Sequence, residues 1–329
     1  MAADAGRGGD EVVDVLGEPW VARTLPLRDD AETARSGVPP VATLVHRAAT
    51  PARTHRRAVL YLHGFVDYFF HPHLADALDA ADWDLYALDL RDYGRSIREG
   101  RRPNHVRELA TYAEEIDAAV AVLHAEHDEV ALLGHSTGGL VAALWADARP
   151  GRVDAVVLNS PWLDLRGSWF ERTLLTWALR PVGRVAPGLV VGHIAPHYGR
   201  ALHRDTGGEW DYDLAWKPHE GFPARAGFIR TVRLSQARVA HGLHVEAPVL
   251  VLTSDASGPD DREHDALLTT DSVLDVAHMA ARAPLLGDDV TLVVVPGGAH
   301  DLALSAAPAR ERYLAEVVGF LDARLPRRD

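Results

Sequence analysis

The pentapeptide Gly134-His135-Ser136-Thr137-Gly138 is the part of the sequence whose residue types and spacing most directly suggest chemistry. It follows a short apolar run, residues 129–133, and precedes an apolar helical pattern, residues 138–148, so we expect it at a sharp turn between a strand and a helix. Small residues on both sides permit such a turn, which presents the Ser136 hydroxyl at the strand end and points the helix N-terminus toward it. Ser136 is therefore the predicted nucleophile.

A serine hydroxyl becomes a good nucleophile only when a base accepts its proton, and His300 is the predicted base. In a strand, turn and helix arrangement of this kind, the partners follow the serine in the order acid, then histidine. The last apolar run, Val290 to Val295, is followed by the glycine-rich loop Pro296-Gly-Gly-Ala-His300-Asp301. That position after the last strand distinguishes His300 from the other 17 of the 18 histidines.

The acid that orients His300 is one of three aspartates that follow the strand predicted over residues 247–253. It must be buried and held in a fixed direction, because it orients the imidazole and stabilises its cation. Asp255 is closest to the strand end, whereas Asp271 opens a segment that carries apolar anchoring residues. We favour Asp271, with Asp255 as the next candidate and Asp275 as the last.

Acyl transfer also requires hydrogen-bond donors for the oxyanion, and two backbone N–H groups are predicted to supply them. One belongs to Thr137, the residue after the nucleophile. The other belongs to Phe65, in the loop after the strand predicted over residues 58–62. His63, just before this donor, is expected to brace the loop.

Strands and helices alternate along most of the chain, which predicts an α/β fold with a mostly parallel, doubly wound sheet. Two N-terminal strands, joined by a polar stretch, precede this alternation, and the predicted sheet has eight strands. The predicted strands cover residues 20–27, 41–48, 58–62, 84–90, 129–133, 153–159, 247–253 and 290–295. The predicted helices cover residues 73–81, 106–127, 138–148, 275–283 and 311–324.

One segment departs from this alternation and is predicted to be a helical cap. We expect a flexible tail at residues 1–17, a core formed by residues 18–160 and 247–329, and the cap at residues 161–246. The cap segment has helical pieces such as Thr173 to Leu179 but no clear strand. Its five tryptophans are expected to form a small core in the cap, or else to line an apolar pocket over the active site. They are Trp162, Trp169, Trp177, Trp210 and Trp216.

Composition excludes several classes of function. The 329 residues include 47% hydrophobic and 25% charged residues, which is typical of a globular protein. A net charge of −13 argues against a nucleic-acid partner. The absence of cysteine excludes a disulfide framework and a thiolate nucleophile. The histidines lack the spacing of a metal site, so we expect no metal or cofactor; Lys217 is the single lysine among 34 basic residues.

The chain also lacks the features that would place it in or across a membrane. No apolar run approaches the roughly 18 residues needed to span a bilayer. The first twenty residues do not have the pattern of a secretory signal, so a cytoplasmic location is expected.

With these motifs, the sequence resembles the α/β-hydrolase superfamily, and within it the monoacylglycerol lipase and lysophospholipase-like branch of serine hydrolases. The resemblance extends from about Trp20 to the C-terminus. It rests on His63-Gly64, the stretch Asp89 to Ser96, Gly134 to Gly138, Asp271-x-Val-x-Asp275 and Gly298-Ala-His300. In the family the first Asp of D-x-V-x-D is the catalytic acid, so the resemblance also implies Asp271.

The expected function is hydrolysis of a carboxylic ester through an acyl-enzyme, with a small-molecule substrate that carries an apolar acyl chain. The resemblance implies a monoacylglycerol or lysophospholipid. Acyl transfer and amide cleavage would use the same three residues. A further alternative is a ligand-binding homologue without catalytic activity. Dehalogenase and epoxide hydrolase chemistry is disfavoured because it requires an aspartate at position 136.

Overall fold

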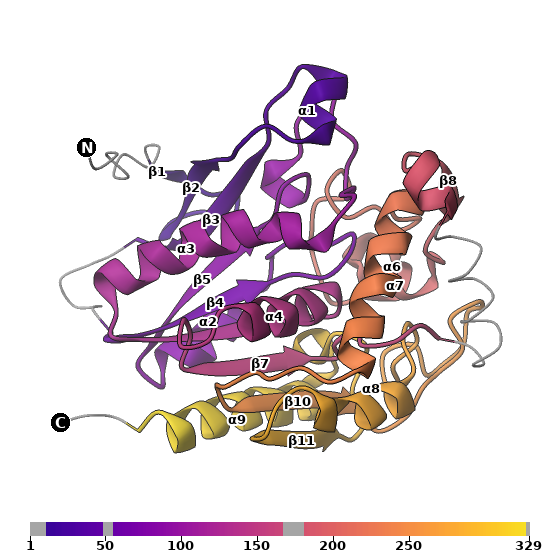
Figure 1. Cartoon of the computed structure of the whole chain (residues 1–329). Helices are drawn as coiled ribbons and strands as arrows, with labels where there is room; N and C mark the ends of the chain where they lie inside the picture. The colour runs from indigo at the N-terminus through magenta and orange to yellow at the C-terminus, as the bar shows by residue number, and fades with distance from the viewer. Residues whose placement is uncertain (1–10, 49–54, 167–180, 327–329) are drawn as a thin grey trace, which may run out of the picture.

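A nine-stranded sheet runs through the molecule, with its strands in the order β1-β2-β3-β5-β4-β6-β7-β10-β11 (Figure 1). The computed structural model describes residues 11–48, 55–166 and 181–326. The six strands from β5 to β11 are parallel, whereas the pairings β1–β2, β2–β3 and β3–β5 are antiparallel. The strands are β1 (Glu11–Val13), β2 (Trp20–Pro26), β3 (Val41–Arg47), β4 (Arg57–Leu62), β5 (Trp83–Asp89), β6 (Glu129–His135), β7 (Ala155–Asn159), β10 (Val249–Ser254) and β11 (Val290–Val295).

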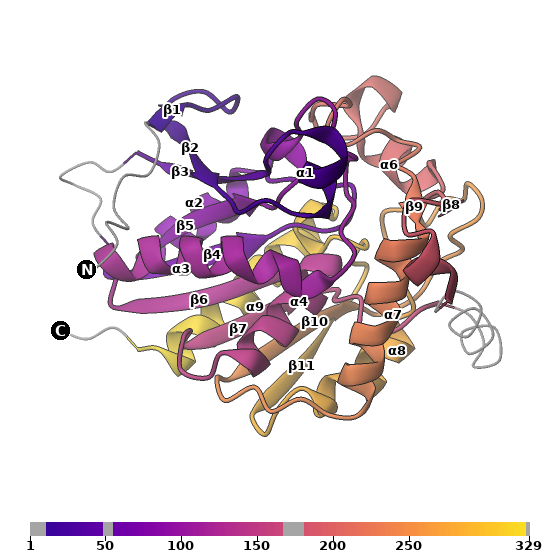
Figure 2. The same cartoon turned by 45° about the horizontal axis from the view of Figure 1, so that its top comes forward.

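Helices cover both faces of this sheet, which explains why its central strands are apolar at nearly every position. Successive side chains of a strand point to opposite faces, so Leu60 of β4 packs in one core and Val59 in the other. Helices α3 and α4 contribute to the first core, and α2 and α9 to the second (Figures 1 and 2). The helices outside the predicted cap are α1 (Ala31–Ser36), α2 (His73–Asp79), α3 (Ala113–Glu126), α4 (Thr137–Ala148), α8 (Val276–Arg282) and α9 (Ala307–Arg324). The structure confirms the predicted mostly parallel, doubly wound sheet.

The strand order reverses between β4 and β6, and this reversal creates the place for a site. From β4 the chain crosses to β5 on one side and then returns to β6 on the other. The loops that leave the carboxyl ends of β4 and β6 therefore diverge and leave a crevice between them. These two loops carry Phe65 and Ser136.

The N-terminal part of the chain differs from the prediction at two places. Residues 11–13, predicted to belong to a flexible tail, form strand β1, which pairs antiparallel with β2 and raises the strand number from eight to nine. The polar stretch before β3 contains the short helix α1. Its start is stabilised by a capping box, in which the Asp30 carboxylate accepts from the Thr33 N–H and the Thr33 hydroxyl accepts from the Asp30 N–H.

A third difference lies in helix α3, which begins at Ala113 rather than at residue 106. A 3₁₀ helix, Leu109–Tyr112, precedes it. Just upstream, Asn104 has a φ of 54°, a left-handed conformation that a helix does not accommodate. The apolar periodicity therefore extends beyond the helix itself. The other 3₁₀ helices are Gly94–Ser96, Arg204–Thr206, Ala283–Leu285 and Leu302–Leu304.

Much of the described part of the segment predicted to be a cap, residues 161–246, lies beyond the carboxyl ends of the parallel strands (Figure 1). It contains helices α6 (His197–Leu202) and α7 (Ala226–Ala240). It also contains two short strands, β8 (Val190–Gly192) and β9 (Ala224–Arg225), which pair antiparallel and were not predicted. The predicted helix Thr173 to Leu179 lies outside the described residues. Within the described ranges, no helix is long and apolar enough to cross a bilayer.

Candidate active site

Ser136 occupies a strained turn between β6 and α4. Its backbone has φ 52° and ψ −113°, a conformation that a non-glycine residue adopts only when its surroundings enforce it. A Cβ on Gly134 would lie 2.5 Å from the Gly138 carbonyl oxygen, and a Cβ on Gly138 would lie 2.4 Å from the His63 carbonyl oxygen. Both glycines are therefore required for the close packing of the helix against the strands.

His300 lies in the loop after β11 and contacts both of its predicted partners. Its Nε2 is 3.1 Å from the Ser136 Oγ, and its Nδ1 is 3.0 Å from each carboxylate oxygen of Asp271. A carboxylate only accepts hydrogen bonds, so Nδ1 donates its proton to Asp271 and the Nε2 lone pair faces the serine hydroxyl. The imidazole is thus oriented to accept the serine proton.

Asp271 is completely buried and is held by backbone donors. Its Oδ1 accepts from the N–H groups of Val273, at 3.0 Å, and Leu274, at 2.7 Å. Its own N–H donates to the Ala256 carbonyl at 2.8 Å. The apolar segment after Asp271 therefore anchors the carboxylate in the direction of His300.

The other two candidate aspartates point elsewhere. Asp255 is exposed and its carboxylate accepts from the Gly297 N–H at 2.9 Å. Asp275 caps the N-terminus of α8 and accepts from the Ala277 N–H at 3.0 Å. Among the residues that the structure describes, only Asp271 forms an ion pair with His300.

The two predicted oxyanion donors lie beside the serine. Thr137 is the first residue of α4, and the N–H groups of a helix's first turn have no acceptor within the helix. Phe65 follows Gly64, where a Cβ would lie 3.3 Å from the Ser136 Cβ, so the loop after β4 packs directly on the nucleophile. Both Phe65 and Thr137 line the pocket that contains Ser136.

His63 holds this loop in place. It is almost fully buried, its Nδ1 hydrogen-bonds the Gly64 carbonyl at 2.8 Å, and its Nε2 accepts from the Leu90 N–H at 3.1 Å. Burial lowers the pKa of His63, which keeps the ring neutral and suits its Nε2 as an acceptor.

Ser136 and His300 open into a pocket of about 590 Å³ between the core and the predicted cap. This volume is in the range of small-molecule sites. Much of its wall is apolar: Phe65, Val66, Trp162, Leu165, Val191, Ile194, Leu202, Ile229, Leu267, Val273, Leu274 and Leu304. Of the cap tryptophans, Trp162 lines the pocket, whereas Trp210 and Trp216 pack in a small apolar cluster beside it. Trp169 and Trp177 lie outside the described residues.

Two charged groups in the pocket wall were missed by the sequence analysis. The Lys217 Nζ lies 2.5 Å from the Asp67 Oδ1. Burial alone would raise the pKa of Asp67, but the Lys217 ammonium and other nearby groups together outweigh it and lower that pKa to about 2. In the sequence, Lys217 is distinguished only as the single lysine of the chain, and nothing in the local sequence indicates its partner.

A second set of buried polar residues lies behind the serine. The ring of His135 is 4.9 Å from that of His300, and its Nε2 is 3.9 Å from the Asp301 Oδ2. The other Asp301 oxygen accepts from the Asn159 Nδ2 at 2.8 Å. Burial, and secondarily His300, lowers the pKa of His135, so this neighbour stays neutral next to the base.

Among the described residues, two groups of side chains each place three potential metal ligands within 4.8 Å of one another, which the histidine spacing did not predict. One is His55, Asp79 and Asp84, far from Ser136 in the sequence. The other is Asp67, His135 and Asp301. In the second group, Lys217 and Asn159 already bind the two carboxylates. The contacts among Ser136, His300 and Asp271 require no ligand from either group.

Comparison with known proteins decides the family. The sequence profile described as "Serine aminopeptidase, S33" matches residues 53–305, about three quarters of the chain. The chain belongs to this serine aminopeptidase family. Together with its relatives, the match identifies the protein as an α/β-hydrolase of the lipase and esterase type, a carboxylic-ester hydrolase.

Three relatives illustrate the similarity. A monoacylglycerol lipase of Mycolicibacterium smegmatis is 28% identical over 287 residues, which cover 86% of this chain and 94% of that protein. A lysophospholipase of Escherichia coli is 29% identical over 159 residues, 46% of each chain. The crystal structure of a monoacylglycerol lipase of Paleococcus ferrophilus superposes on the structure of this chain with a TM-score of 0.64. The two sequences are 21% identical, and the superposition covers 82% of this chain and 95% of the lipase.

Proposed function

We propose that Ser136, His300 and Asp271 form the catalytic triad of a hydrolase that cleaves lipid-like monoesters, of the monoacylglycerol or lysophospholipid type. The observation that carries the proposal is the continuous set of contacts from the Asp271 carboxylate through both nitrogens of His300 to the Ser136 hydroxyl. These contacts end in a largely apolar pocket.

In the first half of the reaction, the Ser136 oxygen attacks the ester carbonyl carbon while His300 Nε2 takes the serine proton. The carbonyl oxygen becomes an oxyanion, which accepts hydrogen bonds from the N–H groups of Phe65 and Thr137. His300 then gives its proton to the alkoxy oxygen as the carbon–oxygen bond breaks, and the alcohol leaves. The acyl group remains on Ser136.

In the second half, water replaces the alcohol. His300 takes a proton from the water, whose oxygen attacks the acyl carbon, and the proton is then returned to the Ser136 oxygen as the ester bond to the enzyme breaks. Asp271 stabilises the imidazolium in both halves without taking up the proton. An alcohol or amine in place of this water would give acyl transfer.

The substrate class is supported by the pocket and by the relatives. Apolar side chains surround the space next to Ser136, so an acyl chain loses its contact with water when it binds there. Two of the relatives act, by their names, on monoacylglycerols and lysophospholipids. A single acyl chain with a polar head suits a pocket with apolar walls and a few charged groups such as Lys217.

The test is turnover of p-nitrophenyl esters of graded acyl length by the wild type and by Ser136→Ala. We expect the variant to lose activity by about 10⁶-fold while it remains folded and no longer reacts with a fluorophosphonate probe. Ser235→Ala, on α7 and outside the pocket wall, is the matched control and should keep full activity. Equal turnover by Ser136→Ala and the wild type would refute the proposal, and product analysis with added glycerol would separate hydrolysis from acyl transfer.

A further inference from the structure

A group of basic side chains lies outside the catalytic pocket, where the core meets the start of α7. We call Arg35, Arg102, His105 and Arg225 the basic cluster. The guanidinium of Arg102 packs against Gly188, where a Cβ would lie 2.5 Å from the Arg102 Nη1. The Nη1 of Arg225 donates to the carbonyl of the same Gly188 at 2.7 Å. Two guanidinium groups, one from the core and one from the predicted cap, therefore meet at one residue.

Little negative charge in the described residues balances this cluster. The Glu32 carboxylate is shared, with Oε2 at 2.7 Å from the Arg35 Nε and Oε1 at 3.3 Å from the Arg102 Nη1. Within the described ranges, Arg225 has no carboxylate at ion-pair distance, and its Nε is buried without a hydrogen-bond partner. Burial and the Arg102 charge both lower the pKa of Arg225, which indicates an excess of positive charge.

His105 adds unused hydrogen-bonding capacity at the same place. Its side chain is almost fully buried, and neither ring nitrogen has a partner among the described residues. Burial, and secondarily the charges of Arg102 and Arg225, lower its pKa to about 4, so the ring is neutral and carries one N–H donor. Buried polar atoms in native proteins are nearly always hydrogen-bonded, to the protein itself or to a bound water or ion. A ligand with acceptor oxygens would satisfy this donor.

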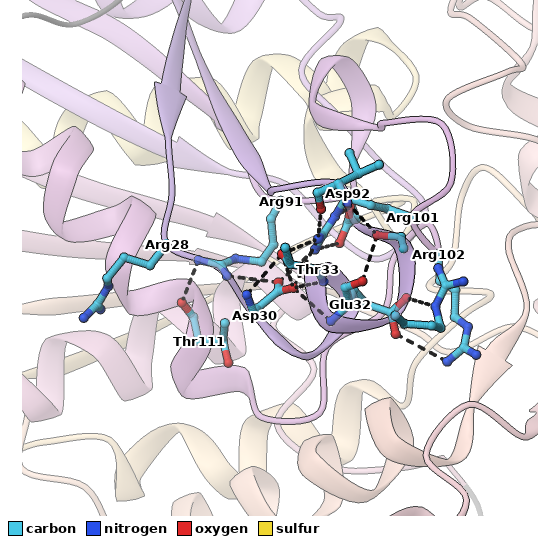
Figure 3. Close-up of polar contacts among 12 residues, drawn as sticks. Arg28, Asp30, Glu32, Thr33, Arg91, Asp92, Arg101, Arg102 and Thr111 are labelled. Carbon is cyan, nitrogen blue, oxygen red and sulfur yellow. Dashed lines mark hydrogen bonds and ion pairs between the residues drawn. The ribbon is translucent and has the colours of Figure 1, made fainter.

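The neighbouring arginines Arg91 and Arg101, unlike the basic cluster, each bind more than one carboxylate (Figure 3). The Arg91 Nη2 contacts Glu115 at 2.7 Å and Glu114 at 3.0 Å. Arg101 binds Asp92 at 2.6 Å and 2.9 Å, and Asp30 at 2.8 Å. Glu32 and Arg102 lie at the edge of this network, on the side away from Arg28 (Figure 3). Arg91 and Arg101 are thus each paired with carboxylates, whereas in the described residues Glu32 is the only carboxylate at ion-pair distance from the basic cluster, although the net charge of the chain is −13.

We propose that the basic cluster is a binding site for a phosphate-type oxyanion, held between Arg102 of the core and Arg225 of the predicted cap. The planar guanidinium fork matches two oxygens of such an anion, and two forks from different elements can grip it from both sides. The anion supplies the negative charge that Glu32 alone does not provide. It also joins the predicted cap to the core. The basic cluster is not part of the wall of the Ser136 pocket, so this site is separate from the proposed catalysis.

The experiment measures the melting temperature and calorimetric binding with inorganic phosphate, against sodium chloride of matched ionic strength. We expect phosphate to raise the melting temperature of the wild type and of Ser136→Ala equally, because a ligand of the folded state stabilises it by mass action. Arg225→Met and Arg102→Met should bind phosphate at least ~10-fold more weakly. Arg312→Met, on an exposed arginine of α9, is the control and should bind like the wild type.

The melting temperature of the variants in phosphate-free buffer shows whether a loss of phosphate binding comes from the missing side chain or from a loss of folding. Arg225→Met removes a repelling charge and one hydrogen bond to Gly188, and it removes no side-chain cap from α7, so its melting temperature in phosphate-free buffer should be close to that of the wild type. Equal effects of phosphate and chloride, or full phosphate binding by both Arg225→Met and Arg102→Met, would overturn the proposal.

Binding to vesicles of phosphatidylcholine with and without phosphatidic acid identifies the source of the oxyanion. Vesicle binding that needs both phosphatidic acid and Arg225 assigns the oxyanion to a lipid headgroup. Binding of inorganic phosphate alone assigns it to a free ion.

Discussion

The Lys217 ammonium and the Asp67 carboxylate form an ion pair of 2.5 Å across 150 residues of chain. Lys217 belongs to the predicted cap, and Asp67 to the loop that presents the Phe65 N–H. Asp67 also accepts from the Gly64 N–H through its other oxygen, at 3.3 Å. This pair therefore links the segment over the pocket to the loop beside the nucleophile.

Replacement of Lys217 alone should lower the free energy of unfolding more than replacement of both Lys217 and Asp67. Lys217→Met leaves Asp67 as a buried, uncompensated carboxylate, and we expect a loss of about 3 kcal/mol in the free energy of unfolding. Lys217→Met with Asp67→Asn removes both charges and should be less destabilised. Urea unfolding of the two single variants and the double variant gives the coupling energy. A double variant as unstable as Lys217→Met would contradict this account.

The ion pair between Lys217 and Asp67 should also make the free energy of unfolding depend on pH in the acidic range. The pKa of Asp67 lies at about 2 in the folded protein, below its ordinary value of 3.8. Its contribution is therefore present above about pH 4 and is lost as the pH falls toward 2. The double variant lacks this carboxylate, so its stability should fall less steeply than that of the wild type over that interval. Parallel curves of unfolding free energy against pH would show that Asp67 does not contribute.

Replacement of the proposed acid tests the geometry around His300. Asp271→Asn keeps the shape of the side chain but presents an amide to Nδ1, which favours the wrong imidazole tautomer. We expect kcat for p-nitrophenyl esters to fall by about 10⁴-fold. Asp255→Asn is the matched control, because this exposed carboxylate contacts the Gly297 N–H and not His300, and it should keep kcat within about twofold of the wild type. A larger loss in Asp255→Asn than in Asp271→Asn would reverse the assignment.

Alanine substitution at two helical glycines, Gly138 and Gly319, should change the stability of the protein in opposite directions. In Gly138→Ala the new Cβ lies 2.4 Å from the carbonyl oxygens of Leu62 and His63, so the variant should be destabilised by at least about 2 kcal/mol and lose esterase activity. In Gly319→Ala, within α9, the Cβ meets no atom within 4 Å. Because alanine is the better helix former, this variant should gain about 0.5–1 kcal/mol. Thermal unfolding of both variants, with circular dichroism as the control for folding, compares them directly.

The sheet type, the turn at Ser136 and the position of His300 could be predicted from the amino-acid sequence. These features are local: a buried parallel strand is a short apolar run, and a tight turn between strand and helix requires glycines such as Gly134 and Gly138. The order of such elements along the chain is also visible without coordinates, so the loop that carries His300 could be recognised as the one after the last strand.

Which side chains meet across long separations in the chain depends on the folded structure. Asp255, Asp271 and Asp275 follow the same strand, and only the folded path of the loop buries Asp271 against His300. The partner of Lys217 likewise depends on how the predicted cap packs on the core. Strand β1 was missed because three residues at an edge carry too little pattern, and their conformation comes from pairing with β2. Side-chain pairing between distant segments is a property of packing, which residue periodicity does not encode.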